Sequence, residues 1–313
     1  MMNKLKYCCT KALPSTWKSA SWLLKLMIPI SLAVTLLQHY GVLEWIAGYL
    51  HPVFVHLGLP GASAVAFISG ASAVAFISGA SAGTYAGIAA MMSMPLTMRQ
   101  ATILAMMIAL CHALPMECAV NRKTGSSFWE MAVLRIVMAF VCAFLLNLIL
   151  PEAAGSYIYL GAAANSSIGE VMSTWVVSQL KMSLMVFLII YVLMIIQRLI
   201  EAYSLLRPLS EFFAPMMRVF GLPRQSAYMW LVGNVLGISY GSAVMLELEE
   251  KGIISRDDAN DVNFHLIMNH SLLEDTIVFG ATGISALLLV ATRVSFAIVL
   301  VWSRRGINKL RRA

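Results

Sequence analysis

Two histidines, each followed closely by a glutamate, are the residues of this chain that are best placed to do chemistry. His112 precedes Glu117 by five residues with Pro115 between them, and His270 precedes Glu274 by four residues. Both pairs lie among apolar residues, where ionisable side chains are costly and mark candidate functional positions. On a continuous helix His270 and Glu274 share one face. In the other pair Pro115 must break the helix before the two groups can converge.

Each pair also has a simpler interpretation, a satisfied structural pair near a helix end. Because the pattern occurs twice, at the same place in each half, we favour a polar binding site. A histidine and a glutamate from each half could also bind a divalent ion, but nothing in the spacing fixes four ligands. We therefore predict no metal site and no cofactor. The predicted substrate-binding residues are His112, Glu117, Asn269, His270, Glu274, Asn234, Tyr85 and Tyr240.

The composition predicts an all-α integral membrane protein. The chain has 313 residues, of which 60% are hydrophobic and 12% charged, whereas a soluble domain carries about 25% charged residues. A helix needs about 20 apolar residues to cross a bilayer, and long apolar runs occupy 22–37, 128–150, 182–196 and 277–302. The net charge of +7 comes from basic residues at the chain ends and in short loops. That placement is typical of membrane orientation signals rather than of nucleic-acid binding.

Self-comparison indicates an internal duplication. A Gly-Leu-Pro motif at 58–60, with a proline six residues before its glycine, recurs at 221–223. Glycine-rich segments follow both motifs, and an alanine lies eleven residues before each histidine. We predict two repeats and their flanking segments: 1–17, 18–150, 151–171, 172–303 and 304–313.

The charge distribution predicts that the two repeats are inverted relative to each other. Both termini are basic and are placed in the cytoplasm, while 151–170 has no Lys or Arg and is placed outside. Each half must then cross an odd number of times. The acidic stretch 247–261 is placed outside, and the glycine-rich stretch of the first half returns inward. The predicted helices are 18–40, 41–58 at the outer interface, a re-entrant helix from Thr97, 127–150, 173–197, 205–221, 225–246, 256–271 and 276–303.

Glycine and proline predict where helices are interrupted. Broken helices at membrane depth free backbone groups for substrate and ion sites, although small residues more commonly serve close helix packing. The segment 61–69 is repeated identically at 70–78, which lengthens the first half by nine residues. We favour a duplication tolerated by a broken segment over a modified gate. The predicted breaks are Gly79, Gly83, Pro115, Gly233 and Gly237.

The Gly-Leu-Pro motif with its glycine-rich follower, the Pro-Leu-Thr-x-Arg stretch at 95–99 and the buried His-to-Glu region resemble the nucleoside recognition (Gate) domain family. Related domains occur in ferrous iron transport protein B and in spore maturation proteins A and B. Two Gate-like units would cover about 20–150 and 172–303. The resemblance implies a bacterial inner-membrane protein with transporter-like inverted repeats. It does not name the ligand, and the GTP-binding domain of the iron transporter has no counterpart in this sequence.

The sequence favours solute movement over enzyme chemistry. It contains no Gly-x-Ser-x-Gly, His-Glu-x-x-His, phosphate loop or dinucleotide fingerprint, so we predict that it is not an enzyme. The predicted function is that of a secondary transporter or permease for a small polar, nucleoside-like solute, working by alternating access. The alternative is a non-transporting membrane scaffold or accessory protein of the spore-maturation type. The expected partners are the lipid bilayer and the solute, with homo-oligomerisation left open and nucleic acid excluded.

Overall fold

The computed structural model describes residues 2–71, 83–152, 155–160 and 166–312. Within these ranges the regular structure is helical, apart from an isolated β-bridge between Thr97 and Ser156. The all-α prediction is therefore confirmed. In the described part of the chain, five helical stretches are long and apolar enough to cross a membrane: Lys4–His39, Met98–Lys123, Phe128–Ile149, Ile168–Ala202 and Ala286–Leu310.

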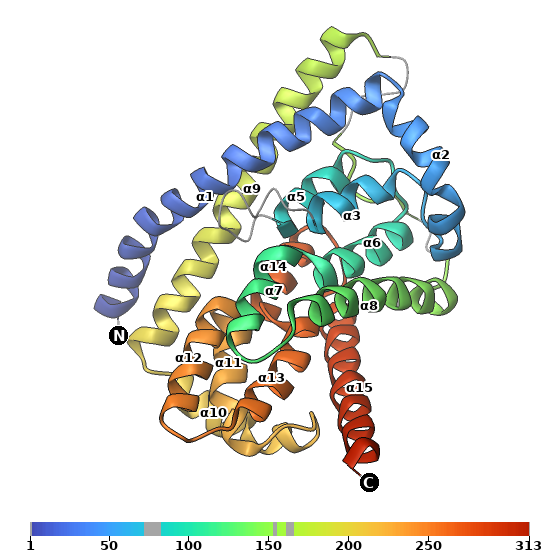
Figure 1. The fold of residues 1–313 in the computed structure, drawn as a ribbon. Helices are drawn as coiled ribbons and strands as arrows, with labels where there is room; N and C mark the ends of the chain where they lie inside the picture. The colour runs from blue at the N-terminus through green and yellow to red at the C-terminus, as the bar shows by residue number, and fades with distance from the viewer. Residues whose placement is uncertain (1, 72–82, 153–154, 161–165, 313) are drawn as a thin grey trace.

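Two long helices form one flank of the molecule. α1 (Met2–His39) and α9 (Ile168–Ala202) run antiparallel and pack against each other along their length (Figure 1). Gln179 donates to the Ser31 hydroxyl at 2.6 Å, and Arg198 donates to the Ser15 hydroxyl at 2.7 Å. Hydrogen bonds of this kind fasten helices to each other where lipid gives no hydrophobic drive to associate.

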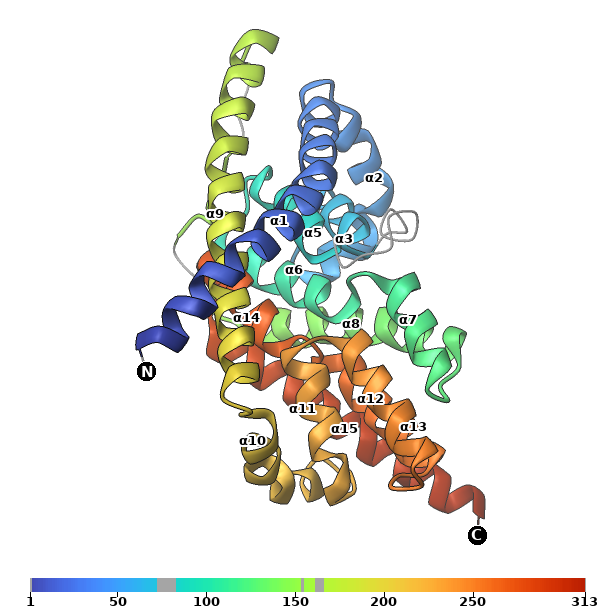
Figure 2. The ribbon, with the colours of Figure 1, turned by 90° about the vertical axis from the view of Figure 1, so that its left-hand side faces the viewer.

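The first half continues from α1 into a compact group of helices, which occupies the upper part of Figure 2. α6 begins at a capping box, in which Thr97 and Gln100 satisfy each other's backbone N–H groups. The helices are α2 (Val42–Phe54), η1 (Val55–Leu57), α3 (Ser63–Ala71), α5 (Gly83–Met92), α6 (Met98–Cys111), α7 (Leu114–Lys123) and α8 (Phe128–Ile149).

The start of α6 lies beside the connection between the halves. The Met98 N–H donates to the Gly155 carbonyl at 3.1 Å, and the Tyr157 N–H donates to the Leu96 carbonyl at 2.9 Å. Groups in hydrogen-bond contact cannot lie on opposite sides of about 30 Å of hydrocarbon. The prediction that the first glycine-rich stretch returns inward, away from 151–170, is therefore wrong.

The helices that follow α9 lie mainly below those of the first half in Figure 2, whereas α9 itself reaches the top of the molecule. α13 begins like α6, at a capping box formed by Ser255 and Asp258. The helices after α9 are α10 (Leu206–Phe213), η2 (Ala214–Arg218), η3 (Arg224–Ser226), α11 (Ala227–Val235), α12 (Ile238–Glu250), α13 (Arg256–Asn269), α14 (Leu272–Ala281) and α15 (Ala286–Arg312).

The predicted span 225–246 is instead a helical hairpin of α11 and α12. The chain reverses at Gly237, whose φ of 93° favours glycine. A Cβ added to Gly241 would lie 2.9 Å from the Cα of Gly233, whereas eight residues along a continuous helix span about 12 Å. Gly233 therefore serves close packing inside α11, and the break falls at Gly237.

The predicted span 276–303 is also interrupted. α14 ends at Ala281 and α15 begins at Ala286, with Gly283 between them at a φ of 92°. The first half turns in the same way between α7 and α8, with Gly125 at a φ of 95°. Hydropathy did not reveal this turn because apolar residues continue on both sides of it.

The acidic stretch 247–261 lies at the same end of the molecule as the C-terminal tail. Arg304 Nε lies 3.2 Å from the Asp261 carboxylate. The neighbouring Asn260 accepts a 2.7 Å hydrogen bond from Ser126, in the loop after α7. Placing 247–261 on the opposite side of the membrane from the tail was therefore wrong, since both segments meet in direct contact.

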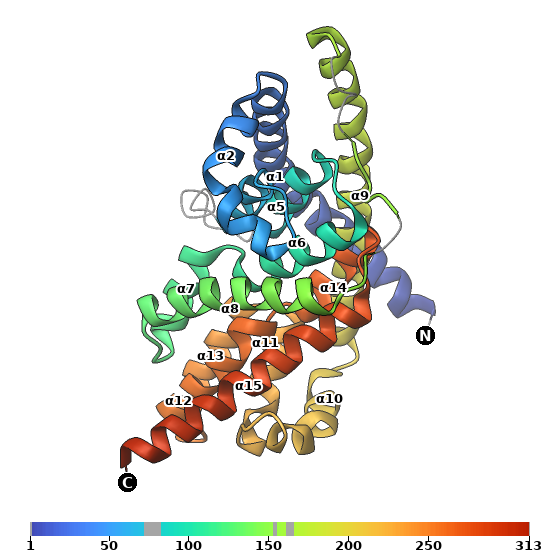
Figure 3. The same cartoon turned by 90° about the vertical axis from the view of Figure 1, so that its right-hand side faces the viewer.

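α8 and α15 both lie toward the viewer in Figure 3, and their outer faces carry exposed apolar side chains. Leu148 and Ile149 of α8 are 65% and 70% exposed, and Leu287 and Val299 of α15 are 80% and 61% exposed. In contrast, the side chains of α6 are buried along nearly its whole length. Apolar faces outside and a broken helix inside are the arrangement expected in a bilayer.

Candidate functional site

Both halves break a helix at their histidine. α6 ends at Cys111, and α7 begins after Ala113, which has a left-handed φ of 44°. α13 ends at Asn269, and α14 begins after Ser271, with a φ of 52°. His270 and Glu274 therefore do not lie on one continuous helix. Pro115 sits in the first turn of α7, a position where its missing N–H costs little.

A buried arginine from α8 holds the first break. Arg135 Nε donates to the Leu110 carbonyl and Nη2 to the His112 carbonyl, both at 2.9 Å. Nη1 pairs with Glu117 Oε2. The side chain is 0% exposed. Arg135 thus satisfies carbonyls that the end of α6 leaves without helical partners and neutralises a buried carboxylate. We call this arrangement the first arginine fork.

A second arginine fork holds the other break. Arg293 of α15 donates to the Met268 and His270 carbonyls at 2.8 Å each, and to Asp275 Oδ2 at 2.6 Å. Each member lies 158 residues after its counterpart in the first fork, as 293 minus 135 shows. The counterpart of Glu117 is therefore Asp275. Pairing Glu117 with Glu274 was wrong, since 274 minus 158 gives Met116.

The two breaks bring their histidines together. His112 Nε2 lies 3.3 Å from His270 Nε2. Glu117 Oε1 lies 3.2 Å from the first of these nitrogens and 3.0 Å from the second. The three residues are 3%, 0% and 2% exposed for His112, His270 and Glu117 respectively. We call them the His–Glu–His triad, which combines two residues of the first half with one of the second.

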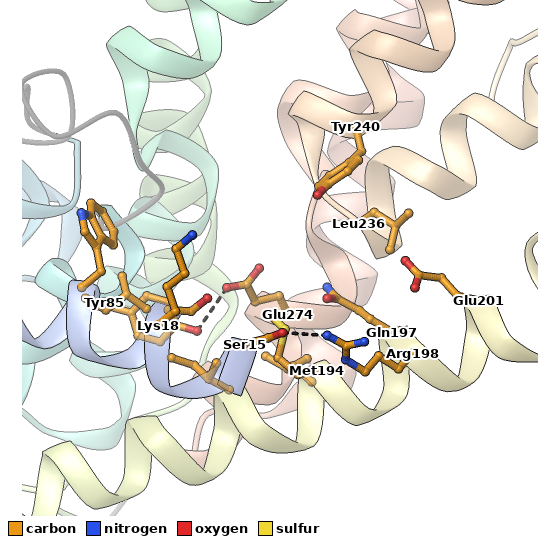
Figure 4. A pocket seen from close by; sticks show the side chains of 15 residues that line it. Ser15, Lys18, Tyr85, Met194, Gln197, Arg198, Glu201, Leu236, Tyr240 and Glu274 are labelled. Atoms are coloured by element: carbon orange, nitrogen blue, oxygen red, sulfur yellow. Dashed lines mark hydrogen bonds between the residues drawn. The ribbon is translucent and has the colours of Figure 1, made fainter. Parts of the chain in front are cut away.

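The second-half glutamate lies elsewhere, at a cavity. Glu274 Oε1 accepts a 3.1 Å hydrogen bond from the Tyr85 hydroxyl. Both side chains line a cavity of about 680 Å³ between α1, α5, α9, α12 and α14, which we call the Glu274 cavity (Figure 4). The polar groups that line it include Ser15, Lys18, Gln197, Arg198, Glu201 and Tyr240.

The remaining predicted site residues are dispersed. Tyr240 lines the Glu274 cavity, whereas Asn234 and Asn269 are buried in α11 and α13 and do not line it. Asn234 Nδ2 donates to the Trp230 carbonyl of its own helix at 3.0 Å. Gly83 begins α5. Gly79 lies outside the described residues, as does most of the second copy of the nine-residue repeat.

Sequence reasoning missed Arg135, Arg293 and Asp275. Each arginine stands inside a long apolar run, where its cost marks it as paired or functional. His112 and His270 already gave the spacing of 158 residues that locates all three. Following that spacing, rather than the nearest acid after each histidine, would have identified Asp275.

Comparisons with known proteins agree with the membrane fold. A family model described as nucleoside recognition (Gate) matches residues 20–126, which include Tyr85, His112 and Glu117. The uncharacterized membrane protein YvoD of Bacillus subtilis (strain 168) is 30% identical over 286 residues, covering 90% of this chain and 88% of that protein. No solved structure matches. The relative matches this chain along nearly the whole length of both proteins, and the family model covers the first of the two broken helices. The chain therefore belongs to the nucleoside recognition (Gate) family of membrane proteins.

Proposed function

We propose that the protein is a transporter or permease for a small polar solute in the bacterial cytoplasmic membrane. The observation that carries this proposal is the Glu274 cavity. Its volume of about 680 Å³ falls in the range of about 300–1,000 Å³ typical of small-molecule sites. Its wall includes the partly buried Glu274 carboxylate, which accepts a hydrogen bond from Tyr85. A membrane scaffold has no need of a charged group at the inner end of a cavity.

The lining of the cavity suits a nucleoside-like solute. Trp22 and Tyr85 offer aromatic rings, and Glu274 and Gln197 offer hydrogen-bonding groups. Glu274 lies between Tyr85 and Gln197 in Figure 4. A planar base stacks on aromatic rings, and its sugar hydroxyls and N–H groups need acceptors such as a carboxylate. The family model's description as nucleoside recognition supports the same class of solute.

We propose that the two halves are inverted repeats and that the solute crosses by alternating access. Contacts at the start of each equivalent helix support inversion. α6 begins beside the connection between the halves, whereas α13 begins beside the C-terminal tail. The cavity opens between the first part of α1 and the last part of α9, which carry the basic residues expected in the cytoplasm. The described state is then the inward-facing one.

Uptake into proteoliposomes tests the proposal. Labelled nucleosides and other small polar solutes are offered to the full-length protein and to Glu274→Gln. Loss of the charged acceptor removes about 1.5–3 kcal/mol of hydrogen-bond energy, so we expect uptake to fall about tenfold or more. Glu211→Gln is the control, because Glu211 is 70% exposed on α10. Normal uptake by Glu274→Gln would remove that residue from the mechanism.

The scaffold remains the second candidate, and one observation favours it. The His–Glu–His triad is packed at the interface of the halves and does not line the cavity, as expected if the polar core only fastens the halves together. Absence of uptake by the wild-type protein over the whole solute panel would favour this function. That the protein is not an enzyme stays a prediction.

A further inference from the structure

The hydrogen bonds of the Nδ1 atoms of the two triad histidines determine which ring nitrogen carries the proton. His112 Nδ1 lies 3.1 Å from the Ala109 carbonyl, and His270 Nδ1 lies 2.8 Å from the Leu266 carbonyl. A carbonyl oxygen only accepts, so each Nδ1 must carry a proton and donate it. In a neutral imidazole the other nitrogen, Nε2, then presents a lone pair.

These lone pairs converge at a place where the hydrogen bonds of the described residues supply no donor. Both Nε2 atoms lie 3.3 Å from each other and within 3.2 Å of Glu117 Oε1. A carboxylate oxygen is also an acceptor, so three acceptors face one another in a fully buried place. Such a group of atoms is unfavourable without a positive charge between them. One proton gives a single donor to three acceptors, whereas a metal ion accepts an electron pair from all three.

We propose that a divalent first-row transition ion of the zinc type binds between His112 Nε2, His270 Nε2 and Glu117 Oε1, and so joins the two halves of the chain. Zinc holds nitrogen and oxygen ligands at about 2.0–2.2 Å in a tetrahedron, which places the ligand atoms about 3.3–3.6 Å apart. The three separations in the triad are 3.0, 3.2 and 3.3 Å. Shifts of a few tenths of an ångström therefore complete the geometry.

The surroundings of the triad are those of a metal site. Both histidines are oriented by carbonyls behind them, and Glu117 is oriented by Arg135, which binds its other oxygen. Partners of this kind behind the ligands fix ring orientation and raise affinity. The two histidines and one carboxylate leave the fourth position of the tetrahedron for a water molecule. This ligand set is one that zinc and ferrous iron both accept.

The second arginine fork provides an internal control for the proposed site. Asp275 is as buried as Glu117 and is paired with an arginine in the same way. Its side chain is one methylene shorter, and the hydrogen bonds and ion pairs of the described residues link it to Arg293 and to neither histidine. Substituting Asp275 therefore disturbs a fork without removing a ligand.

Metal content of the purified full-length protein is the direct test. The protein is produced with added Zn²⁺, washed with a mild chelator in detergent and measured by elemental analysis. We expect the wild type to contain one ion per chain. In His112→Gln and His270→Gln we expect the bound metal per chain to fall about tenfold or more. Asp275→Asn and His265→Gln are expected to keep the ion. His265 is a matched buried histidine whose Nδ1 accepts from Trp230 at 3.1 Å.

Two further measurements keep the proposal testable if a triad variant folds poorly. Co²⁺ bound to the wild type should give the visible absorption of a tetrahedral site, and His270→Cys should keep metal because a thiolate also binds zinc. Added Zn²⁺ should raise the Tm of the wild type but not that of Glu117→Gln.

The proposal is overturned if wild-type protein holds no more metal than His112→Gln, or if Zn²⁺ leaves the Tm of the wild type unchanged. Protons would then occupy the triad. This outcome is independent of the Glu274 cavity, because metal content is measured without a transported solute. A protein that moves nucleosides but binds no metal would refute this inference and leave the proposed function standing.

Discussion

The two arginine forks hold the same break in the two halves, but their carboxylates serve different ends. Glu117 gives one oxygen to Arg135 and the other to both histidines. The carboxylate of Asp275, one methylene shorter, is linked only to Arg293 by the hydrogen bonds and ion pairs of the described residues. The second half instead places Glu274 at the cavity. The broken helix with its buried arginine is therefore repeated in both halves. The carboxylate beside the histidines comes from the first half, and the carboxylate at the cavity comes from the second.

A second difference lies at the contact between the halves. Asn263 of α13 donates to the Thr124 hydroxyl at 2.8 Å and to the Ser126 hydroxyl at 2.9 Å. The position 158 residues earlier is Ala105 in α6, which has no polar side chain. This contact between the halves therefore has no equivalent at the matching position of the first half. Equivalent backbone positions do not imply equivalent interactions.

Removing the arginines should have the largest effect and tests whether the forks are equivalent. Arg135→Leu and Arg293→Leu each leave a buried carboxylate without its partner, which costs about 3–5 kcal/mol. We expect both variants to lose that much free energy of unfolding, measured by denaturation in detergent. Arg207→Leu is the control, because the Arg207–Glu211 pair is exposed, and it should change little. A large loss of unfolding free energy in only one of the two variants would show that the forks are not equivalent.

The asparagine contact should have a smaller effect. Asn263→Ala leaves the buried hydroxyls of Thr124 and Ser126 without their donor, so we expect a loss of about 1–3 kcal/mol. Asn260→Ala removes a single, partly exposed hydrogen bond from Ser126 and should cost about 0.5–1.5 kcal/mol. The same denaturation measurement compares the two. An equal loss of unfolding free energy in the two variants would mean that burial does not make the Asn263 hydrogen bonds more stabilising.

Cysteine labelling tests inversion with the least disturbance to the protein. Pro95→Cys and Ile253→Cys are exposed positions 158 residues apart, just before α6 and α13. In intact cells a membrane-impermeant maleimide should label Pro95→Cys and leave Ile253→Cys unlabelled until the membrane is opened. The unsubstituted protein gives the background from its own cysteines. Labelling of both positions from the same side contradicts inverted halves.

Much of the architecture followed from local chemistry in the sequence. Apolar runs near the length of a bilayer predicted the long helices, and Thr97 and Ser255 predicted helix starts because their hydroxyls cap free N–H groups. Pro115 predicted an interruption near His112, and the predicted end of the helix 256–271 placed another near His270. The breaks themselves depend on residues in the left-handed region, Ala113 and Ser271, which no local signal indicates.

What sequence missed depends on contacts between distant residues. A glycine-rich apolar segment has the same hydropathy whether it crosses the membrane or reverses at Gly237. Whether 247–261 lies inside or outside depends on the Arg304–Asp261 pair, since acidic residues contribute little to orientation. Glu274 was paired with His270 because of its distance along the chain. Its partner Tyr85 lies 189 residues away.

The arginine forks also have a consequence for how the protein is made. In each fork the carboxylate stands 18 residues before its arginine, so it has left the ribosome first. An arginine at the centre of an inserting helix costs about 2.5–3.5 kcal/mol. If α7 and α8 enter the bilayer as one hairpin, Glu117 neutralises Arg135 during insertion, and Asp275 does the same for Arg293. The order of acid before base in each half then allows each pair to enter the membrane uncharged overall.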